Sequence, residues 1–204
     1  MKLPTLTIIK IGGNIVDNPS ALNRFLKDFN AIHGAKILIH GGGKIASELS
    51  KEMGIQPNMI DGRRVTDKET LRVVTMVYGG LINKNITAQL QALGTNAIGL
   101  TGADGNTILS HKRKHPSIDY GFVGDIDQVD GDKIQKLIQA GFSPVFAPLT
   151  HDLKGNILNT NADTVASEVA IALSQFFEVH FYYCFEKKGL LKDIKDENSF
   201  IPHV

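Results

Sequence analysis

The sequence has a single cysteine in 204 residues, so an internal disulfide framework is excluded. Cys184 lies in the apolar run Phe181–Phe185, and we expect it to be a reduced, buried side chain. An excess of one charge is also lacking, because 22 basic and 21 acidic residues give a formal net charge of +1. No basic run alternates with aromatic residues, which argues against a nucleic-acid partner. Any anionic ligand must therefore be held by local groups.

Long hydrophobic runs are absent as well. No apolar stretch approaches the roughly 20 residues that a membrane-spanning helix needs. The first residues, Met1–Thr5, lead into a predicted strand and not into the apolar core of a signal peptide. We therefore expect a cytoplasmic protein with no membrane partner.

Several familiar catalytic motifs are missing from the sequence. The seven histidines form no H-E-x-x-H or other ligand-spaced cluster, so we expect no metal bound by the protein alone. There is no G-x-S-x-G elbow of a hydrolase, no G-x-x-x-x-G-K-[ST] P-loop and no protein-kinase D-F-G. A phosphate site in this chain must be of another type.

The sequence does contain two turns in which an apolar strand ends in glycines. The run Leu6–Ile11 is followed by Gly12 and Gly13, and the run Ile37–His40 is followed by Gly41–Gly43 and a helical pattern. Glycine lets main-chain N–H groups approach a ligand closely, and the N-terminus of a helix favours an anion. These turns predict a phosphate site, although three adjacent glycines also suit a plain tight turn.

The second turn also satisfies the dinucleotide-binding pattern G-x-G-x-x-A over Gly41–Ala46. That fold needs an acidic residue about 20 residues further on, at the end of the next strand. Asp61 falls in a predicted polar loop instead. Dinucleotide binding is therefore the less favoured alternative.

Lys10 interrupts the first apolar strand immediately before its glycine turn. A buried lysine is costly unless it is paired, and the glycines beside it favour a lysine that neutralises a transferring phosphoryl group. The alternative is a half-exposed strand in which Lys10 is simply solvated.

Further polar candidates precede two predicted helices. Arg64 is placed where a guanidinium can clamp a carboxylate, unless it is an ordinary surface arginine. Asn159, Asn161 and Asp163 alternate ahead of an apolar helix. Asn161 or Asp163 can serve as the N-cap of that helix, but three alternating polar side chains exceed what one cap requires.

Strand patterns alternate with helical patterns along the chain. Strands are predicted over 6–11, 37–40, 96–100, 144–149, 156–159 and 179–185, and helices over 20–32, 43–53, 66–93, 132–140 and 162–173. Thr66 and Glu69 suggest a capping box for the long helix, and Gly79-Gly80 should kink it or allow another helix to approach closely. Residues 107–129 are predicted to form a protruding β-hairpin or lid. This order predicts an α/β fold, a three-layer αβα sandwich around a mainly parallel sheet, with ligands at the carboxyl ends of the strands.

The motifs together resemble those of the amino-acid kinase family, which has a carbamate kinase-like fold. The resemblance rests on Lys10–Gly13, His40–Gly43, Gly62–Thr66 and Asn159–Asp163, and extends to Gly99–Gly105, Gly121–Asp125 and Pro144–Pro148. It is strongest to the N-acetylglutamate kinases of arginine biosynthesis. It implies one domain over residues 1–204, in which a lobe of about 1–150 binds acylglutamate and 151–204 begin the nucleotide-binding lobe.

The resemblance implies that ATP with Mg²⁺ phosphorylates the γ-carboxylate of an N-acylglutamate, giving an acyl phosphate, in a protein that is a homodimer. Lys10 and Asp163 would be catalytic, with Asp163 orienting the lysine. Gly42, Gly43, Arg64 and Asn159 would bind the substrate, and Gly12, Gly13 and Asn161 would bind phosphate. The acyl group stays open, because acetyl and succinyl would share all of these contacts.

Two departures from the family pattern lie near the end of the chain. The family continues beyond the position of Val204 with a segment that carries a second catalytic lysine, so the chain is expected to be C-terminally truncated relative to the family. Lys187 and Lys188 stand in a different motif, where the family has a turn near the nucleotide. A non-catalytic or truncated binding or scaffold protein is therefore the alternative function.

Overall fold

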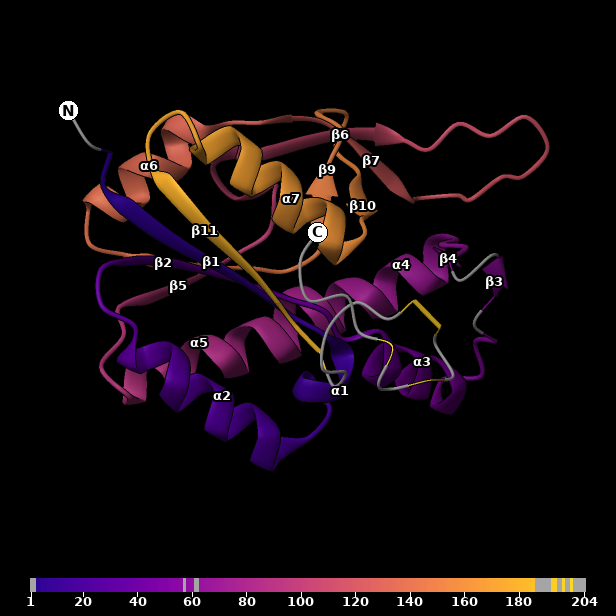
Figure 1. Ribbon diagram of the computed structural model, residues 1–204. Coiled ribbons are helices and arrows are strands. Elements are labelled where there is room, and N and C mark those ends of the chain that lie inside the picture. Colours follow the sequence, from indigo (N-terminus) through magenta and orange to yellow (C-terminus); the bar gives the residue numbers. More distant parts are fainter. Residues whose placement is uncertain are drawn as a thin grey trace.

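Five parallel strands form the centre of the fold, in the order β11-β1-β2-β8-β5 (Figure 1). The computed structural model describes residues 3–56, 58–60, 63–185, 192–193, 196 and 199. The strands are β1 (Thr5–Ile11), β2 (Ala35–His40), β5 (Ala97–Leu100), β8 (Ser143–Phe146) and β11 (Glu178–Cys184). β1 and β2 are covered on both faces, which explains their nearly uninterrupted apolar runs. Predictions that concern Asp61, Gly62, Lys187 and Lys188 lie outside the described residues.

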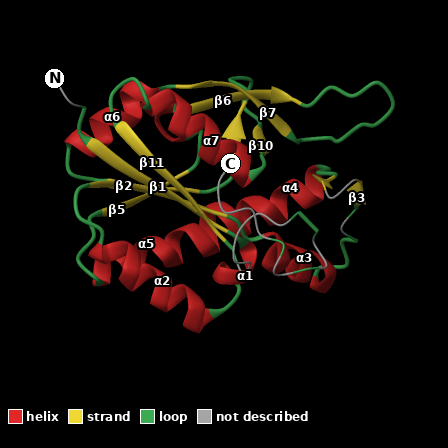
Figure 2. Cartoon of the chain, in the orientation of Figure 1, coloured by secondary structure: helices red, strands yellow, loops and turns green. Residues whose placement is uncertain are grey.

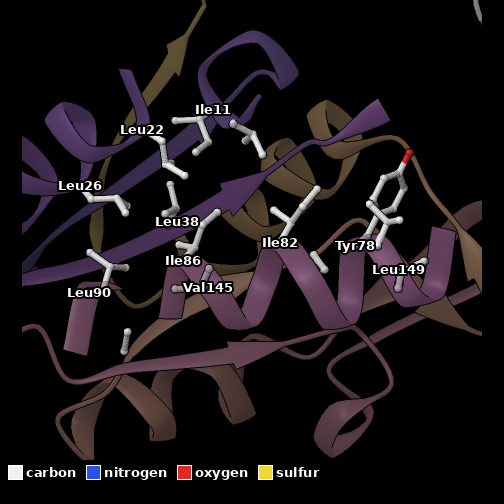
Figure 3. Close-up of a cluster of buried hydrophobic side chains, with 14 of the residues drawn as sticks. Ile11, Leu22, Leu26, Leu38, Tyr78, Ile82, Ile86, Leu90, Val145 and Leu149 are labelled. Carbon is white, nitrogen blue, oxygen red and sulfur yellow. The ribbon is translucent and has the colours of Figure 1, made fainter. Parts of the chain in front are cut away.

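Helices cover both faces of this sheet, so the predicted three-layer αβα sandwich is confirmed (Figure 2). One face carries α2 (Pro19–Ala31), α3 (Gly43–Glu52), α4 (Lys68–Val74) and α5 (Asn83–Ala92), and the other carries α6 (Gly131–Gln139) and α7 (Ala162–Leu173). The short helix α1 (Gly13–Val16) follows the first glycine turn. Each helical layer buries its own apolar cluster against the sheet, and Figure 3 shows the cluster on the α5 side.

A second sheet lies beside the α7 layer, with the strand order β10-β9-β6-β7. Its strands are β6 (Ile108–Lys112), β7 (Gly124–Val129), β9 (Leu149–His151) and β10 (Ile157–Asn159). β6 and β7 pair antiparallel, and the loop between them projects from the body of the protein, as predicted for 107–129 (Figure 1). A small ladder of β3 (Met59–Ile60) and β4 (Arg63–Arg64) occupies the segment that was expected to be a loop.

The long helical stretch differs from the prediction at its start and in its middle. Its N-cap is Asp67, whose side chain accepts from Thr70 N (2.8 Å), so the capping box predicted for Thr66 and Glu69 is wrong. Thr66 instead pairs through its backbone with the β6–β7 loop. Between α4 and α5 the chain forms a π-helix, η1 (Thr75–Ile82). Gly79-Gly80 lies within it, where the sequence predicts a kink or the close approach of another helix.

Two smaller predictions also need correction. The strand predicted over 144–149 divides into β8 and β9, because Pro148 lacks the N–H that a continuous ladder needs. Cys184 is half-buried on the edge strand β11, where partial burial raises the pKa of its thiol.

Among the described residues, no helix has both the length and the apolar character needed to cross a membrane. The same part of the chain holds no group of three or more His, Cys, Asp or Glu side chains suited to a metal ion.

Candidate active site

The two glycine turns lie side by side, because β1 and β2 are neighbouring parallel strands that end at the same edge of the sheet. Ile11 is the register partner of His40, and Gly41 N donates to Ile11 O (3.1 Å). A Cβ atom placed on Gly13 would lie 3.9 Å from Gly43 N. The structure therefore brings together the two turns that the sequence predicts as one phosphate site.

A cleft of about 250 Å³ opens at this edge of the sheet. It contains most of the site residues predicted from the sequence, together with side chains from the β3–β4 ladder, η1 and the β6–β7 hairpin. Its walls are Gly41, Gly42, Gly43, Met59, Arg64, Tyr78, Arg113, Val123, Pro148, Asn159, Thr160, Asn161, Ala162 and Asp163. Segments far apart in the sequence therefore meet around one cavity.

Lys10 is paired with Asp163, as expected for a lysine inside an apolar strand. Its Nζ lies 2.7 Å from Asp163 Oδ1, and the lysine side chain is only 15% exposed while the aspartate is 53% exposed. The alternative of a solvated Lys10 is therefore wrong. Lys10 extends from β1 and Asp163 stands in the first turn of α7, so the pair joins the sheet to the α7 layer.

Arg64 is anchored to the second glycine turn. Its Nη2 donates to Gly43 O (3.0 Å) and to Ser47 Oγ (2.7 Å) in the first turns of α3. Its Nη1 is buried and has no well-formed hydrogen bond to the described residues, although Tyr78 stands beside the guanidinium. The alternative of an ordinary surface arginine is wrong, and a donor remains available to an anion in the cleft.

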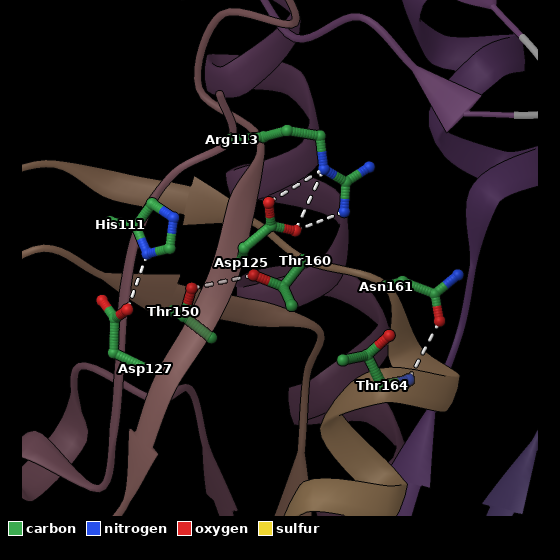
Figure 4. Close-up of polar contacts among 8 residues, drawn as sticks. All are labelled: His111, Arg113, Asp125, Asp127, Thr150, Thr160, Asn161 and Thr164. Carbon is green, nitrogen blue, oxygen red and sulfur yellow. Dashed lines mark hydrogen bonds and ion pairs between the residues drawn. The ribbon is translucent and has the colours of Figure 1, made fainter. Parts of the chain in front are cut away.

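The three alternating polar residues ahead of α7 all face the cleft, but they have different contacts. Asn159 Nδ2 donates to Thr66 Oγ1 (3.0 Å). Asn161 is the N-cap of α7, because its Oδ1 accepts from the backbone N of Asp163 (2.8 Å) and of Thr164 (3.0 Å; Figure 4). The cap uses only the oxygen of Asn161, and its Nδ2 points away from the helix (Figure 4).

Gly42, in the second glycine turn, is a position where only glycine fits. Its φ is +148°, and a Cβ atom there would lie 2.2 Å from Ile82 Cδ1 and 3.5 Å from the Tyr78 ring. The side chains of Tyr78 and Ile82, both in the π-helix, thus pack directly against the glycine turn. Burial raises the pKa of the Tyr78 hydroxyl, and the nearby Arg64 partly offsets that shift.

Substitution of Gly42 by alanine is expected to lower the free energy of unfolding by about 1–3 kcal/mol, because the new methyl group overpacks the contact with Ile82. Urea denaturation measures the change. Gly80→Ala is the matched control, since nothing lies within 4 Å of a Cβ atom at Gly80. Equal stability of Gly42→Ala and the wild type would contradict the close contact.

Comparison with known proteins agrees with this geometry. The model of the family described as "Amino acid kinase family" matches residues 5–175. The chain belongs to the amino acid kinase family.

Relatives within the amino acid kinase family match nearly the whole chain. "Acetylglutamate kinase" of Cytophaga hutchinsonii is 60% identical over 200 residues, which are 98% of this chain and 76% of that protein. The protein of the same name from Bacteroides fragilis is 58% identical over 199 residues, with the same coverage of 98% and 76%. That of Methanopyrus kandleri is 37% identical over 203 residues, covering 98% of this chain and 78% of the relative.

Solved structures show the same amino acid kinase fold. The protein smu.665 from Streptococcus mutans superposes with a TM-score of 0.74 at 25% identity, covering 92% of this chain and 75% of that one. N-acetylglutamate synthase from Neisseria gonorrhoeae superposes with a TM-score of 0.75 at 22% identity, covering 95% of this chain and 44% of that one. In this chain α3 leads to the antiparallel β3–β4 ladder and not to a neighbouring strand of the main sheet, so the βαβ unit that the dinucleotide-binding pattern of Gly41–Ala46 requires is not formed there.

Two cleft residues of this family member were missed in the sequence. Tyr78 lies in an apolar helical pattern, where an aromatic side chain gives no functional signal. Arg113 lies in the segment predicted only as a hairpin or lid, yet its Nε donates to both carboxylate oxygens of Asp125 (3.0 and 3.1 Å) and its Nη2 also contacts Asp125 (Figure 4). Its place in the cleft wall depends on hairpin pairing that a single sequence does not reveal.

His40 lies directly before the second glycine turn, Gly41–Gly43, and is completely buried. Burial lowers its pKa from 6.5 to about 4; Lys84 acts in the same direction and a hydrogen bond to Gly41 opposes the shift. The unfolded chain therefore takes up this proton near pH 6.5 and the folded protein only near pH 4. The free energy of unfolding is therefore expected to fall by roughly 3 kcal/mol as the pH decreases from 6.5 to about 4, because the unfolded chain binds this proton first. Above pH 6.5 the neutral histidine contributes its full stability.

The measurement for this pH effect is the unfolding free energy of wild type minus that of His40→Gln, determined in urea between pH 7.5 and pH 4.5. The variant lacks the imidazole and keeps the other acid-titrating groups, so the difference should shrink as the pH falls. A difference that stays constant over this range would show that His40 is not held neutral by burial.

Proposed function

We propose that this protein transfers the γ-phosphoryl group of ATP to the γ-carboxylate of N-acetylglutamate. The observation that carries the proposal is the Lys10–Asp163 ion pair beside the adjoining glycine turns, at a cleft that the guanidinium of Arg64 also lines. The names of the relatives, acetylglutamate kinases at 58–60% identity, support the same substrate.

The chemistry suits these residues because the attacking carboxylate is already ionised at neutral pH. One carboxylate oxygen attacks the γ-phosphorus, the bond to the β-phosphate oxygen breaks, and the products are an acyl phosphate and ADP. Such a transfer needs positioning and neutralisation of charge more than it needs a general base. Lys10 supplies a fixed positive charge, and Asp163 keeps its ammonium group directed to the site.

Main-chain groups of the two turns would receive the phosphoryl oxygens. Gly42 is the N-cap of α3 and Gly43 its first residue, so their N–H groups lack partners within the helix and the positive end of the helix faces the same place. Gly12 and Gly13 would contribute from the neighbouring turn. Asn161 would add the Nδ2 protons that its capping role leaves available.

The α-carboxylate of the glutamate would bind at Arg64 and Asn159. Arg64 lines the cleft, and its buried Nη1 would gain a well-formed hydrogen bond if a carboxylate oxygen accepted its proton. Asn159 stands across the same cleft, held through Thr66. Together they would fix the substrate so that its γ-carboxylate reaches the glycine turns.

Nucleotide binding is the remaining part of the proposal. ATP would enter with Mg²⁺ carried on its phosphates, from the side formed by residues after 151, whereas residues up to about 150 would hold the acylglutamate. The functional unit would be a homodimer, which light scattering coupled to gel filtration tests directly.

A coupled ADP-release assay with N-acetylglutamate and ATP·Mg²⁺, run with the protein at its full natural length, tests the reaction. Expected is ADP release that requires both substrates, together with an acyl phosphate trapped by hydroxylamine. Calorimetric titration with each substrate separates catalysis from mere binding. Binding of both substrates without turnover would contradict the proposal and would favour a non-catalytic scaffold.

The acyl group is tested by a substrate panel of N-acetyl-, N-succinyl- and free glutamate. N-acetylglutamate is expected to have the highest kcat/KM. A higher value for N-succinylglutamate would leave the kinase chemistry in place and overturn the acetyl assignment alone.

A further inference from the structure

A buried hydrogen-bond chain runs from α5 to the second glycine turn. Asn83 and His40 are both completely buried. Asn83 Nδ2 is 2.9 Å from Val145 O and 3.1 Å from His40 Nε2, and its Oδ1 accepts from Lys84 Nζ (3.2 Å). His40 Nδ1 lies 2.8 Å from Gly41 O.

These contacts determine where the protons are. A backbone carbonyl can only accept, so the atom of Asn83 that faces Val145 O must be the amide nitrogen. The same nitrogen donates to His40 Nε2, which must then be the unprotonated ring nitrogen of a neutral imidazole. His40 Nδ1 therefore carries the proton and donates it to Gly41 O.

The contact between His40 and Gly41 O fixes the direction of the neighbouring Gly42 N–H in the second glycine turn. The peptide bond between Gly41 and Gly42 is trans, so its N–H points opposite to its carbonyl oxygen. Because His40 holds the oxygen against the buried α5 layer, the Gly42 N–H is turned the other way, out of that layer. Because residues 41 and 42 are both glycine, the peptide between them can rotate easily. The hydrogen bond from His40 therefore restrains it more than a peptide between residues with side chains would need.

The surroundings of Asn83 are shaped to hold its amide in place. A Cβ atom at Gly99 would lie 2.2 Å from Asn83 Oδ1, so only glycine leaves room for this side chain. Lys84 Nζ bridges Asn83 Oδ1 and Gly99 O (2.7 Å). Both hydrogens and the oxygen of the amide are thus engaged, which leaves Asn83 a single orientation.

We propose that His40 is a positioning residue of the phosphoryl-transfer site, which holds the Gly41–Gly42 peptide so that the Gly42 N–H faces the transferring group, and that Asn83 fixes the imidazole tautomer needed for this. The proposal rests on the proposed kinase function. His40 does not touch substrate; it acts through the main chain of Gly41.

Two substitutions of His40 separate positioning from packing. His40→Asn places an amide N–H at the depth of Nδ1 and keeps a donor for Gly41 O, but it loses the contact with Asn83. His40→Gln places an acceptor at the depth of Nε2 and keeps the contact with Asn83, but it loses the donor to Gly41. Both remove a buried ring, so both should lower the thermal midpoint.

The expected result is a kcat for His40→Gln that is roughly 10- to 100-fold below wild type, since a misdirected donor no longer meets the transferring group. His40→Asn should recover most of this loss, and KM for the acylglutamate should change little in either variant. If kcat follows the thermal midpoint, or if both variants turn over as fast as wild type, His40 has no positioning role.

The tautomer is measured independently of turnover by ¹⁵N NMR of the imidazole. Expected is a protonated Nδ1 and an unprotonated Nε2 in the wild type at pH 7. Protonation at Nε2 would overturn the proposal even if the kinase activity is confirmed. Absence of turnover in the wild type would instead refute the proposed function before any variant is compared. The tautomer would then be the one test of the hydrogen-bond chain from Asn83 through His40 to Gly41.

Discussion

Replacing Lys10 with alanine is expected to lower kcat by roughly 10²–10³-fold, the loss typical when one charge-stabilising donor is removed from a transition state. Lys10 is mostly withdrawn from solvent and is held by Asp163 at 2.7 Å, so water cannot take over its role easily. KM for the acylglutamate should change much less, because charge builds on the transferring group and not on the glutamate backbone. Steady-state ADP release measures both constants.

The fold should survive this change, because Asp163 is 53% exposed and can be solvated after it loses its partner. Lys136→Ala is the matched control, since this lysine forms an ion pair with Asp132 on the surface of α6, away from the cleft. An unchanged kcat in Lys10→Ala would refute the role assigned to Lys10. A large fall in the thermal midpoint would show that the ion pair mainly joins β1 to α7.

Arg64→Ala is expected to raise KM for the acylglutamate by roughly 10- to 100-fold, as for loss of a hydrogen bond to a charged group. Arg64 lines the cleft and its Nη1 lacks a well-formed partner among the described residues, so we expect the guanidinium to bind a ground-state carboxylate. Nη2 also holds Gly43 O, so a smaller decrease in kcat should accompany the change in KM.

Arg64→Lys serves as the conservative variant, because a lysine keeps the charge but lacks the planar fork of donors. It should fall between alanine and wild type in KM. Arg72→Ala, which removes an exposed arginine beside Glu69 on α4, should behave as wild type. A change in kcat without any change in KM would contradict a carboxylate clamp at Arg64.

Much of the fold was predictable, since hydrophobic period and glycine positions carry most of the information. The predicted helix over 162–173 coincides with α7, where an apolar stripe follows the Asn161 cap. The errors lie where tertiary pairing overrides local pattern. Thr66 suits an N-cap, but its backbone is taken by the β6–β7 loop, which leaves the cap to Asp67.

The candidate site was predictable where it follows strand ends and not where it depends on packing between layers. Lys10 lies near the end of β1 and the glycine turns follow β1 and β2, so parallel pairing alone brings them together. Tyr78 reaches the cleft from the π-helix and Arg113 from the β6–β7 hairpin. Asn83, at the start of α5, contacts His40 behind the glycine turn. Nothing in the local sequence specifies how those elements are rotated against the sheet.

The π-helix η1 makes the site sensitive to the length of this segment. Along its course the chain presents Tyr78 and Ile82 to Gly42, and the next residue, Asn83, to His40. A π-helix holds more residues per turn than an α-helix, and each residue of an α-helix turns the chain by about 100°. Loss of one residue between Thr75 and Ile82 would restore ordinary helix and rotate either the glycine-facing side chains or Asn83 out of register. This segment can therefore exchange exposed side chains such as Met76 and Leu81 more readily than it can change its length.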